Sequence, residues 1–351
     1  MSPRRYAIFT IILGMFGLTA TAQVTAHYIN VGQAASTLLE FRSGAILIDA
    51  GGEDTGDDVY RKHLVSYLND FFTSRPDLNR TLEGIILSHP HIDHTMYLMD
   101  VMQNFTVHAL IDNGATSGSG IAPMKKARTF ATQKHIHYMA VGDTSIHKTG
   151  NALALVEGDG APKILLLSGS RGCDNANNDS IAVRIETPEV ALLFAGDAEN
   201  DDKTCTPELT ALATKFAGTP LLHADLYHVA HHGSFNGTTT DFLNVVTPQI
   251  AIMSAGNPNR KGPGNFHAFQ YGHPREMAVD IVEGAVTGTR SDFGSTSETA
   301  TIFPAAKQTK TVTMTKAIYC TCWDGDIKVV YEAGNKTPKI TTSGFLPAVK
   351  P

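Results

Sequence analysis

The sequence predicts an α/β fold in which two facing β-sheets are covered by helices on both outer sides, with a small β appendage at the C-terminus. Each half of the 351-residue chain has several short apolar strands, which glycines punctuate and segments of helical apolar spacing follow. Two such halves favour a four-layer arrangement, because each sheet and helix has an apolar face to bury. No repeat of solenoid period is present in the sequence.

The first half of the chain alternates predicted strands and helices. A helix over 58–72 places Tyr60 and Leu64 at helical spacing, and Asp57 or Asp58 is expected to cap it. The continuous apolar run at 84–88 predicts a buried strand. The other predicted elements are strands at 26–31, 36–41, 45–49 and 107–112, a helix at 96–105, and a helix that follows the Gly/Ser-rich loop 114–120 and ends at about 134.

The second half repeats this style and ends in a β-like tail. Pro274 is expected in the first turn of a helix over 274–283. The domain boundaries expected are 1–22 for a signal peptide, 23–300 for the main domain and 301–351 for the appendage. The other predicted elements are strands at 163–167, 180–186, 190–194, 226–229 and 249–254, helices at 207–216 and 240–246, and β-like segments at 311–314 and 327–331.

The N-terminus has the pattern of a secretory signal peptide. Arg4 and Arg5 precede an apolar run over 7–18, and Ala20-Thr21-Ala22 follows as a small-residue cleavage pattern. We therefore expect cleavage near Ala22 and a secreted or periplasmic protein, with an uncleaved anchor as the alternative. After this segment, no stretch of the sequence is apolar for long enough to cross a bilayer.

The charge of the mature chain disfavours a long polyanionic partner. The chain has 28 basic and 34 acidic residues, and removal of the expected signal leaves 26 against 34, a net charge of −8. An acidic surface does not attract nucleic acid electrostatically. Nucleic acid therefore stays a candidate partner that the charge does not favour.

Four cysteines fit an oxidising compartment. Cys173 and Cys205 are expected to form a disulfide, because both flank the same predicted pair of strands. Cys320 and Cys322 are expected to be exposed or separately paired. A Cys-X-Cys metal site is the less favoured alternative, since no second pair of Cys or His lies near it in the sequence.

The stretch Ser88-His89-Pro90-His91-Ile92-Asp93-His94 predicts a metal centre. Three imidazoles and one carboxylate lie within six residues, directly after a buried strand. These donors suit zinc, manganese or iron rather than calcium or magnesium. His89 and His91 can bind one ion, while Asp93 and His94 can face a second ion. A polar loop whose histidines are satisfied by hydrogen bonds is the alternative, which four such residues disfavour.

Further candidate ligands follow other predicted strands. Asp197 ends a buried strand in a Gly-Asp pair, and beside the histidine motif it is expected to bridge two ions. His231 and His232 follow another apolar strand. His273 precedes a helix and could serve either as a cap or as a ligand.

In this order the motifs resemble the metallo-β-lactamase superfamily. Asp49-Ala50-Gly51-Gly52 resembles the first motif of that superfamily, an aspartate that orients the metal loop. The resemblance covers roughly residues 23–283 and implies the αββα sandwich of the metallo-β-lactamase fold. Four segments resemble the subgroup of ComEC-type competence proteins and teichoic acid phosphorylcholine esterases, namely Asn178-Asp179-Ser180, Gly196-Asp197-Ala198, His231-His232-Gly233-Ser234 and Tyr271-Gly272-His273-Pro274.

The resemblance also implies a set of ligands. His89 and His91 would bind the first ion, Asp93 and His94 the second, and Asp197 both. One histidine of the pair 231–232, with His231 preferred, would complete the first site. His273 would complete the second site or contact phosphoryl oxygens.

Two departures from the pattern of the superfamily bear on these assignments. Many members have a histidine before the Gly-Asp strand, where this chain has only Asn177, Asn178 and Asp179. The third ligand of the first site therefore stays open. Thr95 and Met96 stand where the subgroup often has two glycines.

The function expected from this resemblance is hydrolysis of a phosphodiester by an exported enzyme with two divalent ions, zinc before manganese. The ions would activate water, Asp93 or Asp197 would orient it, and Asn178, His232 and His273 would stabilise charge on the leaving side. The acidic surface favours a nucleotide or a headgroup such as phosphocholine over long DNA. Hydrolysis of a β-lactam or a lactone is the alternative, and a non-catalytic binding module is a third hypothesis.

Overall fold

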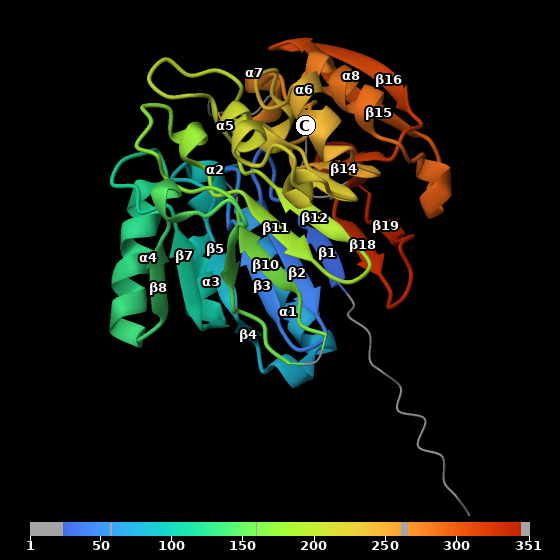
Figure 1. The fold of residues 1–351 in the computed structure, drawn as a ribbon. Helices are drawn as coiled ribbons and strands as arrows, with labels where there is room; N and C mark the ends of the chain where they lie inside the picture. The colour runs from blue at the N-terminus through green and yellow to red at the C-terminus, as the bar shows by residue number, and fades with distance from the viewer. Residues whose placement is uncertain (1–23, 57, 159, 261–265, 345–351) are drawn as a thin grey trace, which may run out of the picture.

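A computed structural model describes residues 24–56, 58–158, 160–260 and 266–344 of the protein, and the expected signal peptide lies outside these residues. Two large β-sheets face each other, and helices cover the outer side of each (Figure 1). Within the described residues, no helix combines the length and the apolar character needed to span a membrane. The predicted two-sheet α/β architecture is therefore confirmed.

The first sheet has eight strands. It is antiparallel from β19 to β3 and parallel from β3 to β8. In spatial order its strands are β19 (Lys339–Thr342), β18 (Ile327–Tyr331), β1 (Val24–Tyr28), β2 (Thr37–Phe41), β3 (Ala45–Ile48), β5 (Gly84–Ile86), β7 (Ala109–Asp112) and β8 (His137–Ala140).

The second sheet has seven strands. It is antiparallel from β9 to β12 and parallel from β12 to β17. In spatial order its strands are β17 (Ile318–Cys320), β14 (Ile250–Met253), β13 (Leu226–His228), β12 (Ala191–Phe194), β11 (Val183–Glu186), β10 (Lys163–Leu166) and β9 (Asn151–Leu153). Two smaller pairs join β15 (Glu298–Ala305) to β16 (Gln308–Met314) and β4 (Thr81–Leu82) to β6 (Thr106–Val107).

The helices and turns connect these strands along the outer faces. The α-helices are α1 (Val59–Ser74), α2 (Ile92–Thr95), α3 (Leu98–Asn104), α4 (Ile121–Lys134), α5 (Glu208–Lys215), α6 (Thr240–Val246), α7 (Ala268–Tyr271), α8 (Glu276–Ala285) and α9 (Thr321–Asp324). The 3-10 turns are η1 (Pro76–Leu78), η2 (Asp143–Ser145), η3 (Ala176–Asp179), η4 (Pro220–Leu222), η5 (Ala230–Gly233) and η6 (Arg290–Phe293).

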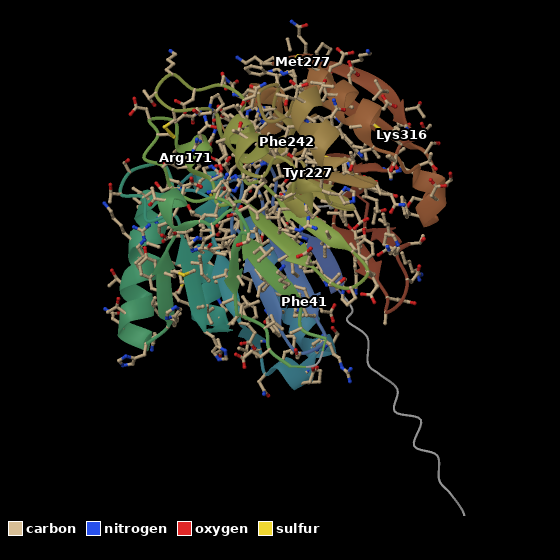
Figure 2. All side chains as sticks on the ribbon, in the orientation of Figure 1. Phe41, Arg171, Tyr227, Phe242, Met277 and Lys316 are labelled. Atoms are coloured by element: carbon tan, nitrogen blue, oxygen red, sulfur yellow. A yellow bond between two sulfur atoms is a disulfide. The ribbon has the colours of Figure 1, made fainter. Side chains whose placement is uncertain are left out.

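Alternation along the strands divides the apolar residues between two cores. Leu47 of β3 packs in the cluster with α1, α3 and α4, whereas its neighbours Ile46 and Ile48 face the second sheet. Such alternation is expected because successive side chains of a strand point to opposite faces. On the far side, Phe242 of α6 packs on Tyr227 of β13, with ring centroids 6.1 Å apart (Figure 2).

Two predicted helix starts need correction. Asp58 precedes α1, but its backbone is left-handed (φ 58°) and its side chain caps no backbone group. Instead its carboxylate accepts a hydrogen bond from Arg61; Asp57 lies outside the described residues. Pro274 lies before α8, which begins at Glu276, because the Arg275 N–H donates to the Gly233 carbonyl and keeps the chain extended there.

Most of the segment from residue 301, predicted to be a small β appendage, pairs with the two main sheets. Strand β17 continues the second sheet, and β18 pairs with β1 in the first. Among the described residues of this segment, only the β15–β16 hairpin forms a two-stranded sheet of its own. The physical reason is that β1 and β14 each offer an edge of unpaired backbone groups, which these strands satisfy.

The disulfides confirm one prediction and correct another. Cys173 is bonded to Cys205, as expected. Cys320 and Cys322, expected to be exposed or separately paired, are buried and bonded to each other between β17 and α9.

Replacement of Ile327 in β18 tests whether the C-terminal strands belong to the main core. Ile327 is fully buried in the core between the sheets, so Ile327→Ala is expected to lower the free energy of unfolding by about 2–5 kcal/mol. Urea unfolding followed by circular dichroism measures this change. Lys339→Ala on the exposed face of β19 is the control, with an expected change within about 0.5 kcal/mol. A separate early transition in Ile327→Ala, with the main transition unchanged, would instead indicate that the C-terminal strands unfold as an independent appendage.

Candidate metal centre

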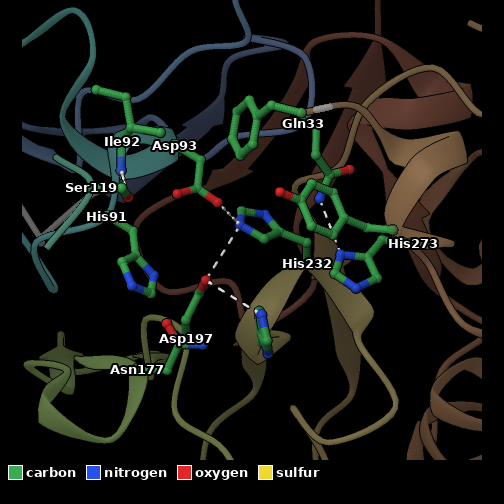
Figure 3. Close-up of a pocket in the computed structure, with 12 residues that line it drawn as sticks. Gln33, His91, Ile92, Asp93, Ser119, Asn177, Asp197, His232 and His273 are labelled. Atoms are coloured by element: carbon green, nitrogen blue, oxygen red, sulfur yellow. Dashed lines mark hydrogen bonds and ion pairs between the residues drawn. The ribbon is translucent and has the colours of Figure 1, made fainter. Parts of the chain in front are cut away.

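The candidate ligands converge because several strands end at the same edge of the two sheets. The histidine loop follows β5, Asp197 follows β12, and η5 with His232 follows β13. In α/β sheets, the loops at the carboxyl ends of parallel strands form the usual ligand crevice. Residues from both halves of the chain therefore line one cavity (Figure 3).

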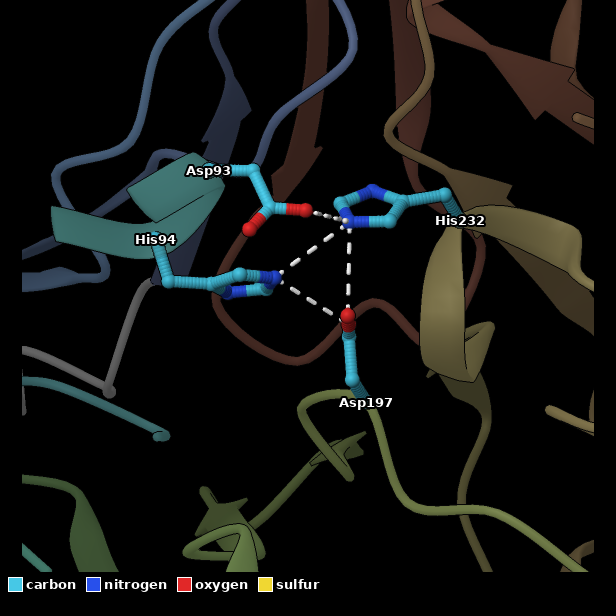
Figure 4. A group of neighbouring side chains, drawn as sticks. All are labelled: Asp93, His94, Asp197 and His232. Atoms are coloured by element: carbon cyan, nitrogen blue, oxygen red, sulfur yellow. Dashed lines mark hydrogen bonds and ion pairs between the residues drawn. The ribbon is translucent and has the colours of Figure 1, made fainter. Parts of the chain in front are cut away.

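Four buried side chains form the first ligand group, here called group A: Asp93, His94, Asp197 and His232. One donor atom of each lies within 4.8 Å of the others. His94 Nε2 is 3.2 Å from Asp197 Oδ1 and 3.3 Å from His232 Nε2, and the latter is 3.2 Å from Asp93 Oδ2 (Figure 4). Two imidazoles and two carboxylates at this spacing are a typical site for zinc or manganese.

Three side chains form the second ligand group, group B: His89, His91 and Asp197. The Nε2 atom of His89 is buried without a hydrogen-bond partner, and Asp197 Oδ2 lies 3.7 Å from it. A buried polar atom without a partner is costly unless a ligand satisfies it. The residues present therefore fit a second ion, and Asp197, which the sequence predicts to bridge two ions, belongs to both groups.

The charges of the centre also fit divalent cations. Burial alone would raise the pKa of the Asp197 carboxyl, but the nearby His94 and His232 lower it well below its usual value. Burial alone would lower the pKa of His94, whereas Asp197 and Asp49 raise it well above its usual value. The carboxylate thus strongly attracts positive charge, which metal ions can supply in place of protons.

Hydrogen bonds to residues outside the two groups fix which ring nitrogen of His94 and of His232 faces the centre. His232 Nδ1 lies 2.6 Å from the carbonyl oxygen of Ser254 and must donate to it. His94 Nδ1 likewise donates to Asp49 Oδ2 at 2.7 Å. Because the proton of each neutral ring is then on Nδ1, both Nε2 atoms present a lone pair to an ion.

Asp49 orients the histidine loop, in agreement with the resemblance. Its carboxylate accepts from the backbone N–H of Ser88 at 2.7 Å, from the Ser88 hydroxyl at 2.9 Å and from His94. The backbone of the loop also approaches Gly51 so closely that a Cβ there would lie 1.6 Å from the Asp93 carbonyl oxygen. Glycine is therefore required at position 51 for the loop to reach its place.

The structure places the two histidines of the pair 231–232 differently. His231 and His232 both have left-handed backbones, with φ of 51° and 54°, and their side chains diverge. His232 enters group A, whereas His231 belongs to neither group, and its Nδ1 lies 3.1 Å from Glu199 Oε1. His232 thus completes group A, while His231, whose Nε2 lies 4.0 Å from Asp197 Oδ2, stays the predicted third ligand of group B.

Asn178, predicted to be catalytic, is not among the described residues that line the cavity. Its side chain is fully buried and accepts from the backbone N–H groups of Glu199 and Glu208. Its amide donates to the Asp201 carbonyl. The neighbouring Asn177 lines the cavity instead, and its Oδ1 is buried without a partner. The sequence indicated an asparagine here but could not tell which of two adjacent amides faces the site.

The cavity above the two groups has a volume of about 340 Å³. His273 lines it without belonging to either group, and its Nδ1 contacts Gln33, a residue that the sequence motifs did not single out. Among the described residues that line the cavity, none is a lysine or an arginine. The lining residues are Gln33, His91, Ile92, Asp93, Ser119, Asn177, Asp197, His231, His232, Phe266, Tyr271 and His273.

Comparison with known proteins identifies the class of protein. A family model described as "Metallo-beta-lactamase superfamily" matches residues 29–256. The chain therefore belongs to this superfamily, whose members are generally metal-dependent hydrolases and typically bind two divalent ions. The fold and family predicted from the motifs are confirmed.

Two curated proteins are similar to this chain. It is 27% identical over 107 residues to ComE operon protein 3 of Bacillus subtilis, a match that covers 30% of the chain and 11% of that protein. It is 25% identical over 272 residues to Recombination protein 2 of Haemophilus influenzae, a match that covers 78% of the chain and 29% of that protein. The resemblance to ComEC-type proteins is thus confirmed, and the chain spans less than a third of either relative.

Among solved structures, the fold is similar to that of YhfI from Bacillus subtilis, described as a metallo-beta-lactamase fold protein. The sequence identity is 12% and the TM-score 0.43, with 76% of this chain and 94% of YhfI covered.

Asp49→Asn is expected to weaken metal binding by about 10–100-fold, the usual effect of removing a residue that orients a ligand. Asparagine tolerates the left-handed backbone of position 49 (φ 59°), but a single amide oxygen cannot accept from all three donors of Ser88 and His94. Competition with a chromogenic zinc chelator measures the affinity, and Asp54→Asn on the exposed loop before α1 is the control. Equal affinities of Asp49→Asn and the unmodified chain would contradict the orienting role.

Proposed function

We propose that the chain is an exported hydrolase that cleaves a phosphodiester with two divalent ions, zinc before manganese. The observation that carries the proposal is that groups A and B share the buried carboxylate of Asp197 at the floor of one cavity. Paired metal sites of this kind suit in-line displacement at phosphorus. The similarity to ComEC-type proteins supports this reaction over other reactions of the superfamily.

The ions, when bound, would lower the pKa of water and neutralise charge on the phosphoryl oxygens. The protein's own side chains would accept the proton and donate hydrogen bonds to the substrate. Asp93 can accept the proton of the attacking water, because its carboxylate borders the cavity. His273 lines the cavity beside the ligands and can donate an N–H group to phosphoryl or leaving oxygens.

A small diester or a headgroup diester is the proposed substrate rather than long nucleic acid. The chain without its expected signal has a net charge of −8, and the described cavity lining has no cationic side chain other than histidine. Proteins that bind nucleic acid instead need Lys or Arg along the phosphate backbone. Tyr271, 44% exposed, and Phe266 offer aromatic surface for the organic part of the substrate.

Export is a further part of the proposal. The disulfides Cys173–Cys205 and Cys320–Cys322 support it, because disulfides persist mainly in oxidising compartments. Secretion or location in a periplasm both agree with this chemistry.

Hydrolysis of bis(p-nitrophenyl) phosphate with added zinc or manganese tests the proposal. We expect metal-dependent turnover, and His91→Ala is expected to lower kcat/KM by at least about 100-fold, since the variant removes a ligand of group B. His108→Ala is the control, because His108 is exposed and pairs with Glu83 far from the centre. Much faster turnover of a β-lactam or a lactone than of any diester would contradict the proposal and favour the alternative function.

A further inference from the structure

Gln33, in the loop after β1, contacts His273, in the turn after α7. Gln33 is 1% exposed and His273 is 7% exposed. Gln33 Nε2 and His273 Nδ1 lie 3.1 Å apart, the contact drawn as a dashed line in Figure 3. The two residues are 240 positions apart in the chain, and neither belongs to a ligand group.

The orientation of the Gln33 amide follows from its other partner. The backbone N–H of Gly256 can only donate, and it meets Gln33 Oε1 at 3.2 Å. The amide nitrogen must therefore be the atom that faces His273. An amide N–H is a donor, so Nδ1 of His273 must accept with its lone pair. The ring proton of His273 is consequently on Nε2.

Gln33 cannot easily turn to reverse this arrangement. Its backbone N–H donates to Glu53 Oε2 at 2.8 Å, and Glu53 is fully buried and paired with Arg260. A Cβ on Gly256 would lie 2.7 Å from the Gln33 nitrogen, so only glycine lets the two segments approach this closely. Contacts on both sides thus fix the orientation of the Gln33 amide, and this orientation fixes the tautomer of His273.

The ring of His273 is held in place on the cavity wall. It stacks on Tyr271 with centroids 5.8 Å apart, and it lies edge-on to His231 at 5.5 Å. No group among the described residues accepts a hydrogen bond from its Nε2. A donor on the wall of the cavity is therefore available to a ligand.

We propose that Gln33 is a positioning residue that fixes His273 as an Nε2–H donor to an oxygen of an anionic phosphoryl group. The identity of the oxygen rests on the proposed function, whereas the tautomer does not. A ring nitrogen that carries a proton cannot coordinate a metal ion, so His273 is not the ligand that completes the second site. His273 instead stabilises charge on the substrate, and Gln33 acts through it.

The tautomer is tested by ¹⁵N NMR of the zinc-loaded chain with ring-labelled histidine, with the His273 signals assigned by their loss in His273→Gln. We expect the Nε2–H form for His273 in the unmodified chain. In Gln33→Leu, which keeps the bulk of the side chain without its donor, we expect a mixture or the Nδ1–H form. Gln103→Leu on the exposed side of α3 is the matched control. An Nδ1–H ring in the unmodified chain, or no change in Gln33→Leu, would overturn the proposal.

Two variants of His273 test the role of its Nε2–H donor. They remain informative if Gln33→Leu fails to fold. The glutamine amide nitrogen can occupy the place of Nε2, whereas the asparagine nitrogen reaches only that of Nδ1. We expect His273→Asn to lower kcat/KM on bis(p-nitrophenyl) phosphate and to weaken inhibition by inorganic phosphate, each by about 100–1,000-fold. His273→Gln is expected to retain activity within about 10-fold of the unmodified chain. Equal losses in both variants would overturn the donor role.

These experiments separate failure of this proposal from failure of the proposed function. If the unmodified chain does not hydrolyse diesters, phosphate binding and the NMR tautomer still decide the role of Gln33 and His273. If diesters are hydrolysed but the tautomer does not depend on Gln33, only the positioning role fails.

Discussion

The structure depends on one constraint, the burial of the Asp197 carboxylate among imidazoles. The side chain of Asp197 is 3% exposed, and His89, His94 and His232 lie within 3.7 Å of it. An isolated buried carboxylate is very costly, and it becomes tolerable only with compensating charge and hydrogen bonds. No lysine or arginine among the described residues lines this cavity, so divalent ions are the natural compensation. The fold can therefore be understood as a scaffold that brings nitrogen ligands to this carboxylate.

Both sheets contribute to that scaffold. The first sheet supplies the histidine loop after β5, and the second supplies Asp197 and His232 after β12 and β13. Metal binding therefore couples the two halves of the chain, because neither half holds a complete group A. The residues that orient the ligands are also shared, since Asp49 holds His94 while the Ser254 carbonyl holds His232. Gln33 extends the same principle from the metal ligands to a residue of the cavity wall.

The sequence predicted what local patterns determine. Strands β3 and β12 are short apolar runs, and the motif from His89 to His94 puts its ligands in one loop, so both could be predicted. Sequence could not predict which of His231 and His232 enters group A, or which of Asn177 and Asn178 lines the cavity, because backbone angles within a turn decide where each side chain points. The pairing of β18 with β1 and the contact of Gln33 with His273 join residues hundreds of positions apart, for which a single sequence has no signal.

A crystal structure of the zinc-loaded chain with anomalous data at the zinc absorption edge tests most directly whether two ions share Asp197. We expect two anomalous peaks that share Asp197 as a ligand. One peak should contact His89 and His91, and the other should contact Asp93, His94 and His232. Absence of any peak at Asp197, or a single ion bound by His231 or His273 instead, would contradict the assignment of a two-metal centre.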